Sequence, residues 1–337
     1  MVEKAKSKSS IIYKFIFGIL ISLCFLYLFF KDLKFDKILS ILARLNYIHY
    51  LWIALILILT NVIRAYRWQF ILRPIKKISL LSSFSNISIG QMANNLLPAR
   101  LGELFRIGSL AKIEKIKTGS LLSALILERL FDGYFLLVFL ILSFWLLDFS
   151  SQSNILVLLK NGTLAAFVLY SVVGLSLVCI IKFKLESFFK RFVPEKLSFI
   201  FYKINDFREG MKNLLSFSSF SILLFYTAFI WGLMTFCMYG TFYLFISIDP
   251  NIFSKVSCLD CMFYIGALGL ASLIPSAPGY FGTFHYVGML SLVSIGLEKN
   301  FADTFAIFSH GSQYILLTFI GLIFFWKEHL KVRELLE

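Results

Sequence analysis

The stretch Leu121 to Leu147 reads LLSALILERLFDGYFLLVFLILSFWLL, and its only charged residues are Glu128, Arg129 and Asp132. An α-helix rises about 1.5 Å per residue, so about 20 apolar residues cross the roughly 30 Å hydrocarbon layer of a bilayer. The stretch therefore predicts a membrane-spanning helix. Ionisable side chains are costly inside hydrocarbon, which makes these three charges candidates for a functional site.

Long apolar runs recur along the chain on both sides of this stretch. Of the residues, 59% are apolar and 15% are charged, whereas soluble domains have roughly 45 to 50% apolar residues. The sequence predicts an all-α polytopic membrane protein, a single integral membrane domain over residues 1–337. Five further runs are long enough to span: Ile11 to Phe30, Tyr50 to Leu72, Ile155 to Ile181, Phe220 to Ile246, and Phe301 to Trp326. The first is too long for a signal peptide, whose apolar region has roughly 7 to 15 residues.

Two other apolar stretches, residues 80–110 and 258–295, are interrupted near their middles. Proline removes a helix donor and glycine permits sharp turns, and such backbone is tolerated at membrane depth only inside protein or beside a wet cavity. Both stretches are therefore expected to be re-entrant helical hairpins. The interrupting residues are Pro98, Gly102, Pro275, Pro278, Gly279 and Gly282.

The two interruptions resemble each other, since both read [NS]-L-[LI]-P-[AS]-x-x-G, at Asn95 to Gly102 and at Ser272 to Gly279. Interrupted segments at corresponding positions of two halves indicate an inverted repeat with a binding site where they meet. The expected halves are residues 1–150 and 151–337, although so short an echo also arises by chance in an apolar sequence.

The formal net charge of +14 lies in short segments between the apolar runs. Nucleic-acid binding needs a basic face on a folded soluble domain, and no such domain is expected here. Basic loops instead favour the cytoplasmic side. This rule places both termini in the cytoplasm of a cell (plasma or inner) membrane, with the first hairpin entering from the cytoplasm and the second from outside. Residues 35–45 and 197–215 have the apolar spacing of interfacial helices.

Polar residues gather at the hairpins and in the third span. Arg100 beside a helix start at Gly102 predicts an anion site, with a merely stabilising Arg100–Glu103 pair as the alternative. Glu128 and Asp132 lie on one helix face and need nearby cations, for which Arg129 and the hairpin arginines are expected. The network then either holds a lipid headgroup or is purely structural. The candidate headgroup residues are Arg64, Arg67, Asn94, Asn95, Arg100, Glu103, Arg106, Glu128, Arg129, Asp132 and His285.

Three of these candidates and one cysteine pair have ordinary alternative interpretations. Arg64 and Arg67 are equally typical of arginines that anchor a helix end at the interface. A lone histidine such as His285 is more often a hydrogen-bonded structural residue than a titrating one. Cys258 and Cys261 form a CxxC without two further ligands nearby, so packing is expected, with a labile disulfide as the alternative.

Motifs for chemistry are missing from the sequence. It has no G-x-x-x-x-G-K-[ST], HExxH or GxSxG motif and no cluster of His and Cys residues. We therefore expect no ATP hydrolysis by a P-loop, no catalytic residues, no metal and no cofactor.

Four segments carry a family resemblance: R-x-Y-R-W at Arg64 to Trp68, N-x-x-P-x-R-x-G-E-x-x-R at Asn95 to Arg106, E-R-x-x-D at Glu128 to Asp132, and P-x-x-P-G-x-x-G at Pro275 to Gly282. Together they resemble the flippase-like transmembrane domain of lysylphosphatidylglycerol synthases, over nearly the whole chain. Many members of that family read P-G-G-x-G-x-x-E where this chain has Tyr280 and His285. Because of this departure, the resemblance does not fix the type of cargo or whether transport is coupled to protons.

The resemblance implies a lipid translocator (flippase or scramblase) that moves a phospholipid or another anionic or aminoacylated lipid between leaflets. The chain lacks the synthase domain and is not expected to make lysyl lipid. Its partners would be membrane lipids and a lipid-synthesis enzyme. The alternatives are a membrane-embedded transferase with Glu103, Glu128 or Asp132 as base, and an accessory subunit of a lipid-synthesis pathway.

Overall fold

The computed structural model describes residues 20–31, 33–97, 101–149, 154–183 and 217–329. Over these residues the fold is helical and contains no β-strand, which confirms the predicted polytopic all-α membrane protein. After a first helix over Leu20–Phe30, the elements are α2 (Phe35–Arg44), η1 (Tyr47–His49), α3 (Tyr50–Leu72), α4 (Leu80–Leu96), α5 (Leu101–Glu114), α6 (Thr118–Leu146), α7 (Asn154–Phe183), α10 (Phe217–Leu244), η3 (Phe245–Ser247), α11 (Ile252–Lys255), α12 (Cys258–Ala271), η4 (Pro278–Tyr280), α13 (Thr283–Ser294) and α14 (Lys299–Lys327).

Within the described ranges, four helices are long and apolar enough to span a membrane. They are Tyr47–Leu72, Val157–Ser176, Ser218–Ser247 and Lys299–Lys327. Helix α6 has 29 residues, but its three charges set it apart from an ordinary apolar span. Of the first predicted run only Leu20–Phe30 is described, and residues 11–19 lie outside the described part. The count of six spans stays a prediction.

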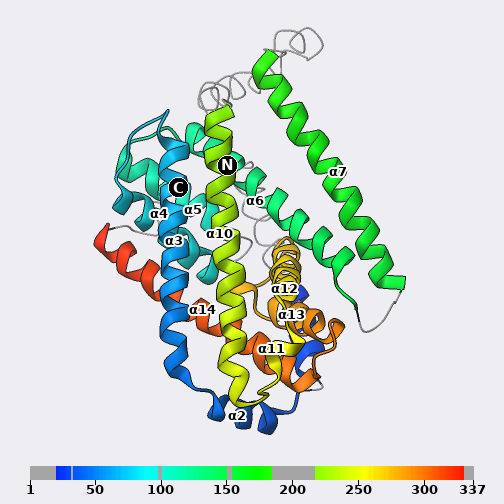
Figure 1. Cartoon of the computed structure of the whole chain (residues 1–337). Helices are drawn as coiled ribbons and strands as arrows, with labels where there is room; N and C mark the ends of the chain where they lie inside the picture. The colour runs from blue at the N-terminus through cyan, green and yellow to red at the C-terminus, as the bar shows by residue number, and fades with distance from the viewer. Residues whose placement is uncertain (1–19, 32, 98–100, 150–153, 184–216, 330–337) are drawn as a thin grey trace.

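The helices form an interior bundle with one peripheral member (Figure 1). Helices α3 and α10 lie side by side, and α14 crosses them at an incline while packing along α4. The close approach of α14 depends on Gly321, where a Cβ atom would lie 2.4 Å from the Ser88 carbonyl oxygen. Helix α7 packs against α6 and otherwise presents large apolar side chains such as Leu158 and Leu175 outward, as a lipid-facing helix does.

The first interrupted stretch forms a pair of packed helices, α4 and α5, with α4 ending before residues 98–100. Those three residues, including Pro98 and Arg100, lie outside the described ranges. The two helices meet at Gly102, where a Cβ atom would lie 2.4 Å from both the Asn94 backbone nitrogen and the Gly90 carbonyl oxygen. Only glycine fits such a contact, because the opposing atoms belong to the backbone.

Glu114, at the end of α5, is held by the segment before α4 and by α4 itself. Lys76 Nζ donates to Glu114 Oε2 at 2.8 Å, and Ser82 Oγ donates to Glu114 Oε1 at 2.7 Å. Partial burial raises the pKa of Glu114, but these hydrogen bonds outweigh it and hold the pKa below the ordinary 4.5.

The second interrupted stretch forms another pair, α12 and α13, joined by an irregular turn. Gly279 (φ 67°), Tyr280 (φ 58°) and Gly282 (φ 84°) adopt left-handed conformations, which explains the two glycines. The predicted breaks at Pro275, Pro278, Gly279 and Gly282 fall in this turn. That either pair is re-entrant in a bilayer stays a prediction, as does the inverted repeat.

Two smaller predictions concern the surface. Helix α2 covers residues 35–44 of the expected interfacial segment, with Ile38 buried and Leu39 exposed. The other expected interfacial segment, 197–215, lies outside the described residues. Cys258 and Cys261 are both free thiols. Cys261 is buried, as a packing residue would be, whereas Cys258 is exposed.

Candidate functional site

Arg67 lies at the centre of a buried polar network between α3, α6 and α10. Its Nη1 lies 2.7 Å from Asp132 Oδ1 and its Nη2 lies 3.1 Å from Asp132 Oδ2, a two-pronged pairing that suits a guanidinium group. Arg67 also donates to Glu128 Oε1 at 2.9 Å and to Thr227 Oγ1 at 3.0 Å. Its side chain is 1% exposed, so a cation paired with two carboxylates lies in the interior; its Nε alone has no hydrogen-bond partner.

Glu128 connects Arg67 to the first hairpin. Its second carboxylate oxygen lies 2.9 Å from Arg106 Nη1, and both side chains are nearly inaccessible. Arg106 also donates to Asn86 Oδ1 at 3.2 Å, and its guanidinium carbon lies 4.0 Å from the ring centroid of Trp68. A cation over an aromatic face is attracted to it. Glu128 therefore fixes α3, α5 and α6 to one another through two buried arginines.

Arg129 forms the accessible edge of the network. Its Nη2 lies 2.9 Å from Glu103 Oε1, and its Nη1 lies 3.6 Å from Asp132 Oδ2. The Arg129 side chain is 43% exposed and that of Glu103 is 24% exposed. Glu103 Oε2 is buried and has no hydrogen-bond partner. The Arg129–Glu103 pair is thus the part of the network that a ligand can reach.

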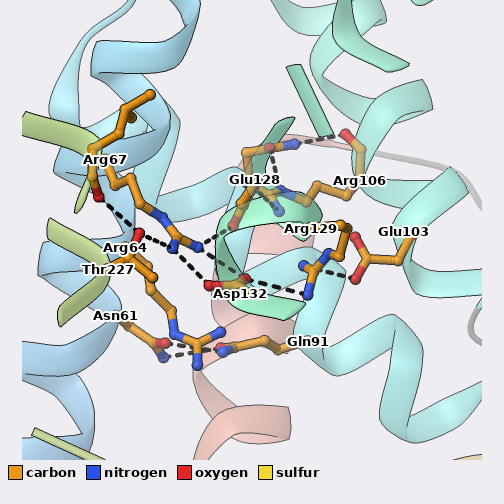
Figure 2. A network of polar contacts seen from close by, with 12 residues as sticks. Asn61, Arg64, Arg67, Gln91, Glu103, Arg106, Glu128, Arg129, Asp132 and Thr227 are labelled. Atoms are coloured by element: carbon orange, nitrogen blue, oxygen red, sulfur yellow. Dashed lines mark hydrogen bonds and ion pairs between the residues drawn. The ribbon is translucent and has the colours of Figure 1, made fainter. Parts of the chain in front are cut away.

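The charges of the network do not balance. Figure 2 shows four arginines (Arg64, Arg67, Arg106, Arg129) and three carboxylates (Glu103, Glu128, Asp132). Arg64 is the arginine left over: over the described residues it has no carboxylate within ion-pair distance, and its Nη2 lies 3.1 Å from the Met234 sulfur. In Figure 2 its guanidinium lies beside Asn61 and Gln91, which bond each other.

A pocket with partly polar and partly apolar walls lies where the two hairpins meet. Its volume is about 130 Å³, and its walls come from Asn94 and Leu97 at the end of α4 and from Ser272–Ala277 and Tyr280 in the second turn. Asn94 Oδ1 and Ser276 Oγ are buried without a hydrogen-bond partner. A Cβ atom on Gly279 would lie 3.2 Å from the Asn95 carbonyl oxygen, so the second turn rests directly on α4. The pocket offers unused polar atoms to a ligand.

His285 lies in α13 and, in the described part of the chain, forms no hydrogen bond or ring contact with an arginine. His310 Nδ1 lies 3.1 Å from His285 Nε2, so α13 and α14 share a histidine pair. Phe29 and Phe281 pack against His285. This pair fits the structural interpretation of His285 and does not bring it to the arginine network.

The structure corrects one of the sequence interpretations. Arg67 is not an interfacial anchor, because it is buried and paired with two carboxylates. Glu103 pairs with Arg129. The Arg100–Glu103 pair stays a prediction, because Arg100 lies outside the described residues. Arg106 pairs with Glu128 and Arg129 pairs with Asp132, as predicted. Arg67, which was not among the predicted cations, pairs with both carboxylates.

Several network residues were not identified from the sequence. Asn61 and Gln91 bond each other. Asn86 and Trp68 contact Arg106, and Thr227 accepts a hydrogen bond from Arg67. Asn61 and Asn86 are polar residues within apolar helical runs, which is the signal that identifies them. Asn95 binds Thr318 Oγ1 at 2.8 Å and so serves to fix α4 on α14. Among the described residues, no three His, Cys, Asp or Glu side chains gather as a metal site.

Comparison with known proteins gives two similarities. Residues 15–321 match the family model described as the lysylphosphatidylglycerol synthase transmembrane region. The UPF0104 membrane protein MJ1595 of Methanocaldococcus jannaschii is 26% identical over 338 residues, which cover 90% of this chain and 92% of that relative. No solved structure matches this chain significantly.

Proposed function

We propose a transport function from the premise that this chain belongs to the family of the lysylphosphatidylglycerol synthase transmembrane region. In this proposal the protein moves a phospholipid, or another anionic or aminoacylated lipid, between the two leaflets. It does so without hydrolysing ATP, because the sequence has no P-loop motif.

The observation that carries the proposal is the pocket between two interrupted hairpins, whose walls include polar residues, in a protein made largely of apolar helices. A headgroup that crosses a bilayer needs a polar route, since polar groups in hydrocarbon are costly unless hydrogen-bonded. Asn94 Oδ1 and Ser276 Oγ supply unused hydrogen-bonding atoms. The acyl chains of the lipid would stay outside, beside the exposed apolar surface.

The ion pairs of the network are of two kinds. The buried pairs hold the helices in place, whereas the partly exposed Arg129–Glu103 pair can exchange one partner for a ligand. Breaking a buried pair such as Arg67–Glu128 leaves an unpaired charge and costs about 3–5 kcal/mol. Exposed pairs contribute only about 0–1 kcal/mol, so the half-exposed Arg129 exchanges Glu103 for a lipid phosphate at low cost. Arg129 is the residue proposed to meet the phosphate, while Arg67 and Arg106 hold the helices that present it.

Direction would come from gradients. An anionic headgroup that moves outward gains about 2.3 kcal/mol per charge for each 100 mV of inside-negative potential. A scramblase would use no gradient and would equalise the leaflets.

The test is leaflet exchange in vesicles. The purified chain is reconstituted with a fluorescent phospholipid, and dithionite added outside reduces only the probe in the outer leaflet. Exchange faster than in empty vesicles is expected, and Arg129→Gln should slow it at least about tenfold, because a hydrogen bond to a charged group contributes about 1.5–3 kcal/mol. Lys255→Gln, in an exposed pair with Asp249, is the control and should leave exchange unchanged.

Failure of the wild-type protein to exceed empty vesicles, across anionic and zwitterionic headgroups, refutes the proposal. Equal slowing by the control and by Arg129→Gln refutes the role given to Arg129. Each variant is first compared with the wild type for its elution profile, so that misfolding is recognised.

A lipid transferase is the second candidate, and one observation favours it. A general base needs a carboxylate that is free to accept a proton, and Glu103 has one oxygen without a hydrogen-bond partner. Glu128 and Asp132 each contact two arginines and suit this role poorly. A change in lipid mass after incubation with the protein supports the transferase, whereas exchange without a mass change supports transport. A role as accessory subunit predicts co-purification with a lipid-synthesis enzyme and no exchange by the chain alone.

A further inference from the structure

Tyr280 has a backbone conformation that large side chains seldom adopt. Its φ is 58°, in the left-handed region, and it lies between Gly279 and Gly282, whose φ values are 67° and 84°. Glycine adopts this region freely, whereas a bulky residue there is strained, and such strain gathers at binding sites. A third glycine at this position would form the turn with less strain. The tyrosine therefore points to a role for its aromatic side chain.

Tyr280 lies where the two hairpins face each other. It lines the pocket of about 130 Å³ together with Asn94 and Leu97 of the first hairpin. Tyr280 also interacts electrostatically with Arg129, the accessible arginine of the network. Its ring is held by a stack on Phe284, with the ring centroids 4.6 Å apart and the planes 14° from parallel. Tyr280 therefore connects the pocket with the arginine proposed to meet a phosphate.

The volume of this pocket limits the group that can enter it. A cavity of about 150 Å³ binds one benzene molecule. A pocket of about 130 Å³ therefore accepts a group of about that size, such as glycerol or ethanolamine, whereas inositol or a glycerol that carries an amino acid is larger. Ser276 is 4% exposed and places a hydroxyl oxygen without a hydrogen-bond partner at the wall. The group that fits best is therefore small and polar.

We propose that Tyr280 is a specificity-determining residue, whose ring keeps the pocket small and thereby excludes large headgroups. This inference rests on the proposed function and narrows it: the cargo has a small polar group on its phosphate, and aminoacylated lipids are excluded. Removal of the ring would widen the pocket at the Tyr280 wall. Glycine at this position would also relieve the strained backbone, so the tyrosine serves selectivity rather than stability.

The first experiment compares two lipids that differ in the size of the headgroup but not in its charge. Fluorescent phosphatidylglycerol and phosphatidylinositol with the same acyl chains are placed in separate vesicles with the full chain, and leaflet exchange is followed with dithionite. One extra methylene group in a closed pocket is discriminated about 10–200-fold, so the wild type should exchange phosphatidylglycerol at least about tenfold faster. Tyr280→Gly should accelerate phosphatidylinositol and bring the two rates within about threefold of each other. Tyr280→Phe keeps the ring and should keep the wild-type ratio.

Control variants separate the size of the pocket from general damage. Tyr27→Ala removes an exposed tyrosine ring from the first helix and should leave the ratio unchanged. Tyr280→Ala keeps the strained backbone, so its thermal transition should lie below that of Tyr280→Gly, which is the reverse of the usual order of the two residues. If Tyr280→Gly fails to fold, Tyr280→Asn provides the same comparison, because asparagine tolerates left-handed backbone and is smaller than tyrosine.

A second measurement separates the size limit from translocation. The full chain in detergent is heated with the monophosphate of glycerol or with that of inositol, which carry the same phosphate on a small and a large group. A ligand that binds the folded state raises the thermal transition. Glycerol phosphate should raise it in the wild type, whereas inositol phosphate should raise it only in Tyr280→Gly.

Each outcome decides between the two proposals. If the wild type exchanges no lipid but distinguishes the two phosphates in detergent, the proposed function fails and the size limit stands. Equal exchange of the two lipids by the wild type, or an unchanged ratio in Tyr280→Gly, overturns the size limit and leaves translocation intact. A wild type that neither exchanges lipid nor distinguishes the two phosphates overturns both.

Discussion

Glu128→Gln is the change that tests the buried network most directly. It keeps the size of the side chain but removes a charge that lies 2.9 Å from Arg67 and 2.9 Å from Arg106. Arg67 retains Asp132, whereas Arg106 is left with the Asn86 amide and the Trp68 ring. The network then holds four arginines against two carboxylates, and the unpaired cation is almost completely buried.

The expected cost follows from that burial. Removing one partner of a buried pair destabilises by about 3–5 kcal/mol, and the hydrogen bonds that Gln retains place this variant near the lower value. With an unfolding entropy of about 2.1 cal/mol/K per residue, a loss of about 3 kcal/mol in a chain of 337 residues corresponds to a fall of about 4 °C in the thermal transition. Purified variants heated in detergent and analysed by size-exclusion chromatography provide the measurement.

Two further variants make the result specific. Glu114→Gln breaks an ion pair of similar length, but Lys76 is 46% exposed, so the expected loss is below about 1 kcal/mol. Adding Arg106→Gln to Glu128→Gln removes the unpaired cation and should restore part of the stability. The reasoning is refuted if Glu128→Gln and Glu114→Gln lower the transition equally, or if the double variant is no more stable than the single one.

Three other predictions concern packing, pH and reactivity. Gly102→Ala should destabilise the first hairpin by about 1–3 kcal/mol, because its Cβ meets the backbone of α4 at 2.4 Å, whereas Gly119→Ala meets nothing within 4 Å and should not destabilise in the same thermal assay. The folded-state pKa of Glu114 is lowered, so its contribution is present above the ordinary 4.5 and is lost as the pH falls below it. The stability difference between the wild type and Glu114→Gln should therefore vanish in acid. A difference that grows as the pH falls would contradict a lowered pKa of Glu114. A maleimide should label the exposed Cys258 in the native protein and leave the buried Cys261 unreacted until denaturation, as mass spectrometry of peptides would show.

The sequence was sufficient for the helical class and for the second irregular turn, because both follow from local rules. Long apolar runs leave few alternatives to helices, and the glycines at 279 and 282 mark left-handed backbone that other residues seldom adopt. It was also sufficient to mark Glu128, Arg129 and Asp132 as unusual, since charges inside an apolar run are rare.

The partners in the network were harder to identify, because they depend on helix packing. Arg67 has the sequence context of an interfacial anchor, with aromatic residues on both sides, and nothing local shows that α6 lies against it. The way α3 is rotated about its axis and packed against α6 brings the Arg67 guanidinium to Glu128 and Asp132. For the same reason the left-over charge of Arg64 emerges only after every other pair has been assigned.

The inclination of α14 makes the protein sensitive to the thickness of its host bilayer. Lys299–Lys327 has 29 residues and is therefore about 43 Å long, whereas the hydrocarbon layer measures about 30 Å. Such a helix fits by leaning, as α14 does relative to α3 and α10 in Figure 1. It also bears Gly321, against which the first hairpin rests, and Thr318, which holds Asn95. Lipids with shorter or longer tails would change how far α14 leans, and the pocket between the hairpins would change shape with it.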